Sequence, residues 1–159
     1  MTKVENMDSI GWRPQTIVPQ TQHSVRTRDL YSQLKEAGLR PTRQRLALAE
    51  ILFSSGDRHL TAETLYEEAR ATRYPPSLAT IYNTLNQFAE HGLVREIALY
   101  GSKVWYDTKT GPHYHFYLED KDELFDIPEE LVPALNIPAP EGTEGSGVDV
   151  VIRLKSKRR

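Results

Sequence analysis

Two histidines separated by a single residue are the feature of this sequence best suited to chemistry. His113 and His115 lie in residues 113–119, a segment whose composition predicts a β-strand. Residues two apart on a strand point to the same face, so both imidazoles can address one metal ion or one cofactor. Such a pair is also common on an ordinary surface strand, and both interpretations stay open at this point.

The absence of cysteine narrows the chemistry further. The 159-residue chain has none, which excludes disulfides, thiolate zinc sites, cysteine-ligated haem and thiol catalysis. A nucleophile motif, a phosphate-binding loop and a His-Glu-x-x-His arrangement are also missing, so we do not expect an enzyme. No apolar run approaches the ~18 residues that cross a bilayer. With no signal-peptide pattern at the start, we expect a cytoplasmic protein without a membrane partner.

A second candidate surface lies in residues 69–89, which contain no acidic residue. Within this stretch Ser77 can cap a helix that ends at Gly92. The face opposite the apolar stripe of this helix carries short hydrogen-bonding groups and an aromatic ring, which suit base edges and phosphates in a DNA major groove. An ordinary solvated helix would more often mix Lys and Glu there. The residues of this polar face are Thr80, Tyr82, Asn83, Asn86 and Gln87.

The elements that must position these groups follow from periodicity and capping residues. Apolar stripes predict four helices, of which the second and third begin after Thr42 and Thr61. A hairpin is expected from residues 93–98 and 103–107 around a turn at 100–102. Strands at 113–119, 123–127 and 148–154 and a short helix at 129–135 complete the pattern. This order predicts an α+β fold, an N-terminal winged helix-turn-helix followed by a small α/β dimerisation domain.

Charge is distributed unevenly, although the formal net charge is only -2. Residues 26–45 hold six basic and two acidic residues, whereas residues 101–147 hold three basic and ten acidic ones. A basic front and an acidic middle fit a polyanion-binding part joined to a separate module. We therefore expect four regions: a flexible arm (1–25), a winged-helix DNA-binding domain (26–108), a dimerisation and sensing domain (109–155) and a basic tail (156–159).

Three linked blocks carry a family resemblance. "GLRPTRQRLALAEIL", "HLTAETLYEEA" and "SLATIYNTLNQFAEHGLV" resemble, in order and spacing, the signature blocks of the ferric uptake regulator superfamily. The likeness runs from about residue 30 to 127 and implies that residues 77–91 are a recognition helix for double-stranded operator DNA. Tyr82 matches a thymine-contacting position and Arg40 a minor-groove position, while Asn83 departs from the arginine of many relatives. The expected DNA contacts are Arg40, Ser77, Thr80, Tyr82, Asn83 and Asn86.

The same resemblance implies a regulatory metal site at the hinge between the two domains. Its ligands would be His59, Asp107, His113, His115 and Asp126. Such a mixed nitrogen and oxygen set suits Fe(II), Mn(II) or Zn(II). Relatives carry a cysteine pair for a structural zinc where this chain has Leu118 and Lys121, so no structural cysteine-ligated zinc is expected.

The His-x-His strand, the missing cysteine pair and the short C-terminal part most resemble the iron response regulator branch, known from rhizobia and related bacteria. That resemblance implies a homodimeric or larger regulator of haem-synthesis and iron-homeostasis genes, a repressor that can also activate. Haem held by His113 and His115 would release it from DNA, and a haem-synthesis enzyme is a further expected partner.

The alternative is a direct Fe-, Mn- or Zn-dependent repressor of the ferric uptake regulator type. An ion at the five implied ligands would then act as corepressor. A peroxide sensor that oxidises its own histidine ligands is a variant of this alternative.

Overall fold

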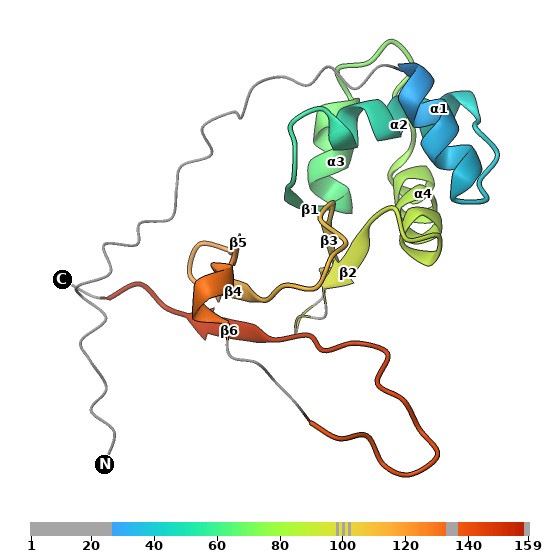
Figure 1. The fold of residues 1–159 in the computed structure, drawn as a ribbon. Helices are drawn as coiled ribbons and strands as arrows, with labels where there is room; N and C mark the ends of the chain where they lie inside the picture. Colours follow the sequence, from blue (N-terminus) through green and yellow to red (C-terminus); the bar gives the residue numbers. More distant parts are fainter. Residues whose placement is uncertain (1–26, 98, 100, 102, 133–136, 158–159) are drawn as a thin grey trace, which may run out of the picture.

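Four helices form the first part of the chain in the computed structural model, which describes residues 27–97, 99, 101, 103–132 and 137–157 (Figure 1). They are α1 (Thr27–Glu36), α2 (Arg43–Phe53), α3 (Ala62–Ala69) and α4 (Leu78–Glu90). The expected flexible arm and part of the expected turn at 100–102 lie outside the described residues. So do the end of the helix expected at 129–135 and the last two residues of the basic tail.

Hydroxyl side chains begin three of these helices at the predicted positions. The first turn of a helix leaves backbone N–H groups without partners, and a side-chain oxygen can accept from one of them. Thr42, Thr61 and Ser77 each accept from the backbone N–H three residues ahead. The starts of α2, α3 and α4 are therefore determined by local sequence.

The apolar stripes of the four helices meet in one core. Burial of each such side chain contributes about 1.5–3 kcal/mol relative to an exposed one. Tyr106 from the neighbouring sheet closes the core, and its hydroxyl donates to Oδ1 of Asn86 at 2.7 Å. The helical residues almost without exposure include Leu30, Leu34, Leu48, Leu52, Leu65, Ile81, Leu85 and Phe88.

A three-stranded antiparallel sheet adjoins the helices in the order β1-β3-β2. Strands β2 (Arg95–Ile97) and β3 (Trp105–Asp107) are the predicted hairpin, the wing of the winged helix. The short strand β1 (His59–Thr61) was not predicted. The register places His59 opposite Asp107 on the central strand, and this pairing matters for the functional site.

A second sheet has the order β5-β4-β6. Strands β4 (His115–Leu118) and β5 (Glu123–Asp126) pair antiparallel, with His115 opposite Asp126. Strand β6 (Val151–Leu154) pairs parallel with β4 and starts three residues later than expected. A 3-10 turn, η2 (Glu129–Leu131), occupies the start of the helix expected at 129–135.

The strand predicted from residue 113 begins only at His115, so His113 lies outside it. Pro112 precedes His113 and has no N–H to donate to a neighbouring strand. The His113 ring also turns back, and its Nδ1 lies 2.7 Å from the carbonyl oxygen of Gly111. The strand is therefore shorter than predicted at its start, although both histidines still face one site, because the Nε2 atom of each lies next to Asp107.

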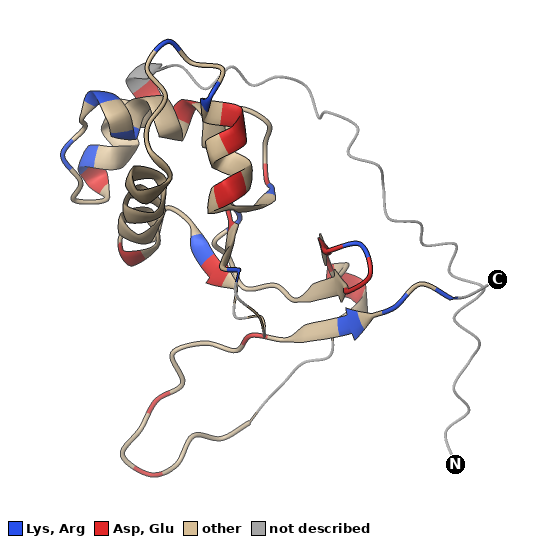
Figure 2. Cartoon of the chain, turned by 180° about the vertical axis from the view of Figure 1, so that it is seen from behind, with Lys and Arg blue, Asp and Glu red and all other residues tan. Residues whose placement is uncertain are grey.

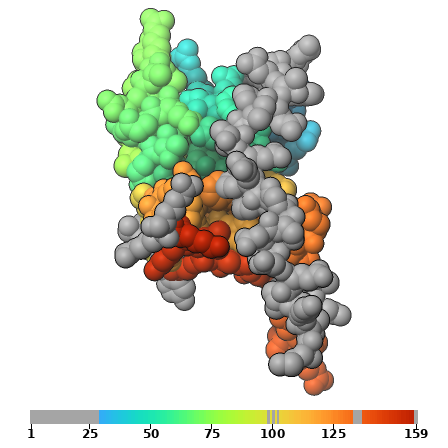
Figure 3. Space-filling view, turned by 90° about the vertical axis from the view of Figure 1, so that its left-hand side faces the viewer, coloured from blue at the N-terminus to red at the C-terminus, as the bar shows by residue number. Residues whose placement is uncertain are grey.

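The wing sheet lies between the helices and the second sheet, as Figure 1 shows. In the space-filling view the helical part, coloured blue to green, sits above the orange and red strands of the second sheet (Figure 3). The α+β class and the winged helix followed by a small mixed unit are confirmed. Among the described residues, no helix is both long enough and apolar enough to cross a bilayer.

The cap of α3 yields a stability prediction. Thr61→Ala removes the oxygen that accepts from Thr64 N at 3.2 Å, whereas Thr61→Ser keeps it and loses only the methyl group. The alanine variant should be less stable than the serine variant by about 1 kcal/mol. Urea unfolding in chelator measures the difference, and equal midpoints for the two variants would show that the cap contributes nothing.

Candidate functional site

The two sheets bring together all five residues implied as metal ligands. His59, Asp107, His113, His115 and Asp126 each offer one nitrogen or oxygen atom, and these atoms lie within 4.8 Å of one another. The wing sheet supplies His59 and Asp107, and the second sheet supplies His115 and Asp126. His113 comes from the segment between the sheets. The cluster therefore joins the two parts of the fold.

Asp107 is at the centre of the cluster, and its side chain is fully buried. Its Oδ2 atom lies 2.7 Å from Nε2 of His113 and 3.1 Å from Nε2 of His115. Nε2 of His59 is 3.4 Å away. Three imidazole nitrogens thus surround one carboxylate oxygen.

The His113 ring is oriented by its outer nitrogen. Nδ1 must donate to the Gly111 oxygen, because a carbonyl can only accept. In the neutral ring Nε2 then presents a lone pair to Oδ2 of Asp107, and two acceptors repel each other at this distance. A positive charge removes the repulsion, either as a proton on the ring or as a cation between the two atoms. An outer N–H held by a carbonyl is also the usual arrangement of a metal-ligating histidine.

Two buried atoms of the cluster have unmet hydrogen-bonding capacity. Nε2 of His59 and Oδ1 of Asp126 lie 2.9 Å apart. Even so, neither makes a hydrogen bond to any residue that the structure describes. Their contact is therefore an ion pair without hydrogen-bond geometry, and both atoms can bind a cation once His59 has lost its proton. Three imidazoles and two carboxylates fit a divalent cation that accepts nitrogen and oxygen ligands.

The electrostatics of the cluster are dominated by its carboxylates. Burial by itself lowers the pKa of His59, but the nearby Asp107 and Asp126 outweigh burial and raise it to about 9. Burial lowers the pKa of His115, and the neighbouring histidines add to that effect. Burial works to raise the pKa of each carboxyl, yet the histidines around them lower both values. The cluster therefore holds ionised carboxylates and a protonated His59 at neutral pH.

Lys109, which is not one of the five clustered residues, donates hydrogen bonds to the carboxylates of both Asp107 and Asp126. The sequence did not predict this role. Its backbone N–H donates to Oδ1 of Asp107 at 2.8 Å, and its Nζ donates to Oδ2 of Asp126 at 3.2 Å. The remaining oxygen of each carboxylate is thereby turned toward the histidines. No sequence signal reveals the contact with Asp126, because Lys109 follows β3 and Asp126 lies on β5, 17 positions away.

The residues expected to bind DNA lie on or near α4. Figure 2 shows that α4 carries no Lys or Arg, and that Glu90 at its end is its one acidic residue. Ser77 is the cap of this helix, and its hydroxyl contacts that of Thr80 at 2.9 Å. Asn83 and Asn86 are exposed, although Oδ1 of Asn86 accepts from Tyr106.

Two further contacts hold this surface in place and were not predicted. The Tyr82 hydroxyl donates to Oε1 of Glu63 on α3. Arg45 on α2 donates twice to Oε1 of Gln87 on α4, and it also donates to the backbone oxygen of Arg40 at 2.8 Å. Arg45 therefore joins the segment of Arg40 to α4. Glu63 is an acidic residue in the first turn of α3, a common position that does not indicate a contact with Tyr82.

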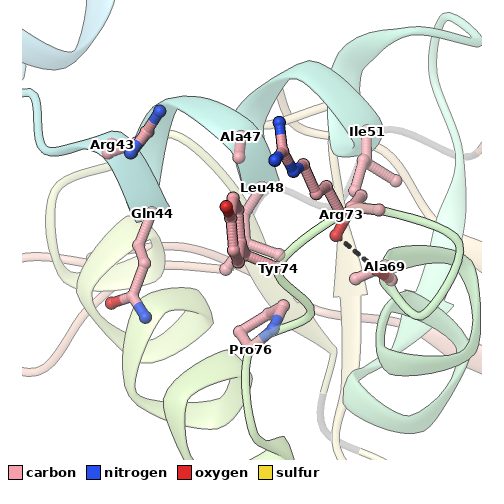
Figure 4. Close-up of a pocket in the computed structure, with 10 residues that line it drawn as sticks. Arg43, Gln44, Ala47, Leu48, Ile51, Ala69, Arg73, Tyr74 and Pro76 are labelled. Carbon is pink, nitrogen blue, oxygen red and sulfur yellow. Dashed lines mark hydrogen bonds between the residues drawn. The ribbon is translucent and has the colours of Figure 1, made fainter.

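A separate cavity of about 240 Å³ lies between α2 and the segment that leads into α4 (Figure 4). Its floor includes Ala47, Leu48 and Ile51 of α2, and Tyr74 stands over them. Arg43 and Arg73 lie at its rim, so basic groups flank the approach to α4. None of the five clustered residues lines this cavity.

Curated relatives match the chain in part of its length. The peroxide operon regulator of Bacillus subtilis is 37% identical over 94 residues, which are 59% of this chain and 64% of that protein. The ferric uptake regulation protein of Vibrio anguillarum is 33% identical over 100 residues, 62% of this chain and 67% of that protein. The chain thus spans less than two thirds of the first of these relatives.

Solved structures match over more of the chain. The Vibrio cholerae ferric uptake regulator has a TM-score of 0.64 at 25% identity, covering 79% of this chain and 98% of that one. The ferric uptake regulator of Pseudomonas aeruginosa with manganese has a TM-score of 0.63 at 26% identity, covering 81% and 98%. The family model described as "Ferric uptake regulator family" matches residues 36–143. The chain therefore belongs to the ferric uptake regulator family.

Proposed function

We propose that this chain is a transcriptional repressor whose affinity for operator DNA is set by a divalent cation of the Fe, Mn or Zn class. The observation that carries the proposal is the cluster of three histidines and two aspartates between the sheets, in which Asp107, His113 and His115 are buried. The family relatives are named as regulators and repressors, and one solved neighbour was determined with manganese. These names support a regulator in preference to an enzyme.

The residues of the cluster explain how a cation bound there can affect the placement of the two sheets relative to each other. A bound divalent cation would supply the positive charge that this set of donors can share. His59 and Asp107 belong to the wing sheet, whereas His115 and Asp126 belong to the second sheet. A site made by both sheets favours conformations in which they meet, and so favours one placement of the wing relative to the second sheet.

The cluster favours a metal ion over haem. The side chains of His113 and His115 are 1% and 3% exposed, and their Nε2 atoms face Asp107. Haem ligation through either nitrogen would require Asp107 to move out of the centre, whereas an ion can be held with Asp107 in place. Haem and a haem-synthesis enzyme are therefore not part of this proposal, and the iron response regulator branch is not singled out.

For the DNA-binding surface we propose α4 with the segments that flank it. The contacts would be made by Arg40, Ser77, Thr80, Tyr82, Asn83 and Asn86. The division into a DNA-binding domain (26–108) and a sensing domain (109–155) is retained in this proposal. We also propose a homodimer on a partly palindromic site. Exposed Leu131 and Ile152 in the second part provide apolar surface for a partner copy.

The metal requirement is tested by DNA binding in chelator and after addition of Mn(II), Fe(II), Zn(II) or haem. A duplex selected from random DNA by the protein with Mn(II) serves as the probe. We expect binding to strengthen with a divalent ion and to weaken again in chelator. Tight binding in chelator that haem abolishes would overturn the proposal in favour of haem sensing.

The pKa of His59 predicts that metal binding releases a proton. Below pH 9 the ring is protonated in the metal-free protein, and a ligating nitrogen must be neutral. Binding at pH 7.5 should therefore release about one proton, and the affinity should rise about tenfold per pH unit before levelling off near pH 9. Calorimetry in buffers of different ionisation enthalpy measures this release. His91→Gln, outside the cluster, should keep it, and buffer-independent heats would contradict the assignment.

The proposed base contact gives a further prediction. Tyr82→Ala should reduce discrimination between the selected duplex and a scrambled one by about 1–3 kcal/mol. Tyr31→Ala, which removes a half-exposed tyrosine from α1, is the matched control and should leave it unchanged. Fluorescence anisotropy at fixed salt measures both. Equal losses in the two variants would exclude Tyr82 as a specific contact.

A further inference from the structure

Glu63 on α3 faces the residue proposed to read DNA bases. Tyr82 Oη donates to Glu63 Oε1 at 2.5 Å, across the contact between α3 and α4. We infer that Glu63 is a positioning residue: it fixes the Tyr82 ring for base contact and thereby sets sequence discrimination. The inference rests on the proposed DNA-binding function and deepens it.

Core packing holds the Tyr82 ring, so the hydroxyl is the part of this side chain that Glu63 can fix. The ring is half-buried against the helical core, and the hydroxyl reaches Glu63 at an exposed position. Thr61 caps α3 two residues before Glu63, so the carboxylate is presented from a rigid first turn. The hydrogen bond lowers the pKa of Glu63 and raises that of Tyr82, so the acceptor is ionised at neutral pH. A charged acceptor makes a stronger hydrogen bond than a neutral one.

The same carboxylate has a second effect on DNA binding. Residues 69–89 contain no acid, so Glu63 brings a negative charge from α3 to Tyr82 in an acid-free stretch of the chain. Lys103 of the wing lies near enough to help lower its pKa. Phosphates repel the Glu63 charge regardless of base sequence. Glu63 should thus improve discrimination through Tyr82 while weakening affinity for all DNA.

These two effects are separable by substitution. Glu63→Gln keeps an oxygen that can accept from Tyr82 but removes the charge. Glu63→Ala removes both. Tyr82→Phe deletes the same hydrogen bond from the other side and leaves Glu63 intact, so it tests the contact even if a Glu63 variant folds poorly. Glu67→Ala is the matched control, because Glu67 lies one turn further along α3 and pairs with Arg70.

The experiment measures dissociation constants for the selected duplex and the scrambled duplex, with Mn(II) present. Glu63→Gln should tighten both and keep their ratio within about twofold, because only the charge is lost. Glu63→Ala and Tyr82→Phe should each lower the ratio by about tenfold. In the Tyr82→Phe background, Glu63→Ala should lower it no further, and Glu67→Ala should leave it unchanged.

Two outcomes would overturn this inference and leave the proposed function standing. One is a ratio unchanged in Glu63→Ala. The other is an equal loss from Glu63→Ala with and without the Tyr82 hydroxyl, which would show that Glu63 acts through helix stability rather than through Tyr82. If the wild-type protein selects no duplex from random DNA, the proposed function fails and the inference fails with it.

Discussion

The approach of three imidazole nitrogens to one buried carboxylate oxygen is the interaction on which the architecture of the site depends. A carboxylate without solvent is costly unless it is paired, and Oδ2 of Asp107 finds its partners on three separate segments. Two strand registers fix four members of the cluster: β1 with β3 sets His59 opposite Asp107, and β4 with β5 sets His115 opposite Asp126. A one-residue slip in either register would turn a member of the cluster to the opposite face of its sheet.

The parts of the fold that were predictable are those specified by nearby residues. The capped helices and the wing follow from hydroxyl side chains, apolar stripes and a turn, and all of these act within a few positions. β1 spans only three residues, too few to show a period, and its pairing with β3 joins segments 48 positions apart in its His59–Asp107 pair. The parallel pairing of β6 with β4 is likewise set by tertiary contacts rather than by local pattern.

The candidate site was predictable to a smaller extent. Spacing alone identified His113 and His115, although His113 approaches Asp107 from outside the strand that suggested the pair. The other three members came from the family resemblance, since nothing in their own spacing links them. The role of Lys109 could not be found because its side chain contacts Asp126, which is distant in sequence. On α4, periodicity identified the polar face but not which of its groups are already engaged, as Gln87 is by Arg45.

The position of β6 late in the chain affects the order in which the parts of the protein fold during synthesis. Its last strand, Val151–Leu154, lies beside β4, with the 3-10 turn and a long connection in between. The strand pairings of the wing sheet are complete by residue 107, so the helices and the wing can begin to fold while the rest of the chain is still in the ribosome. The strand that carries His115 acquires its second neighbour only after Leu154 emerges. The helices and the wing of the newly made chain can therefore form before the sheet that supplies two of the five residues of the cluster.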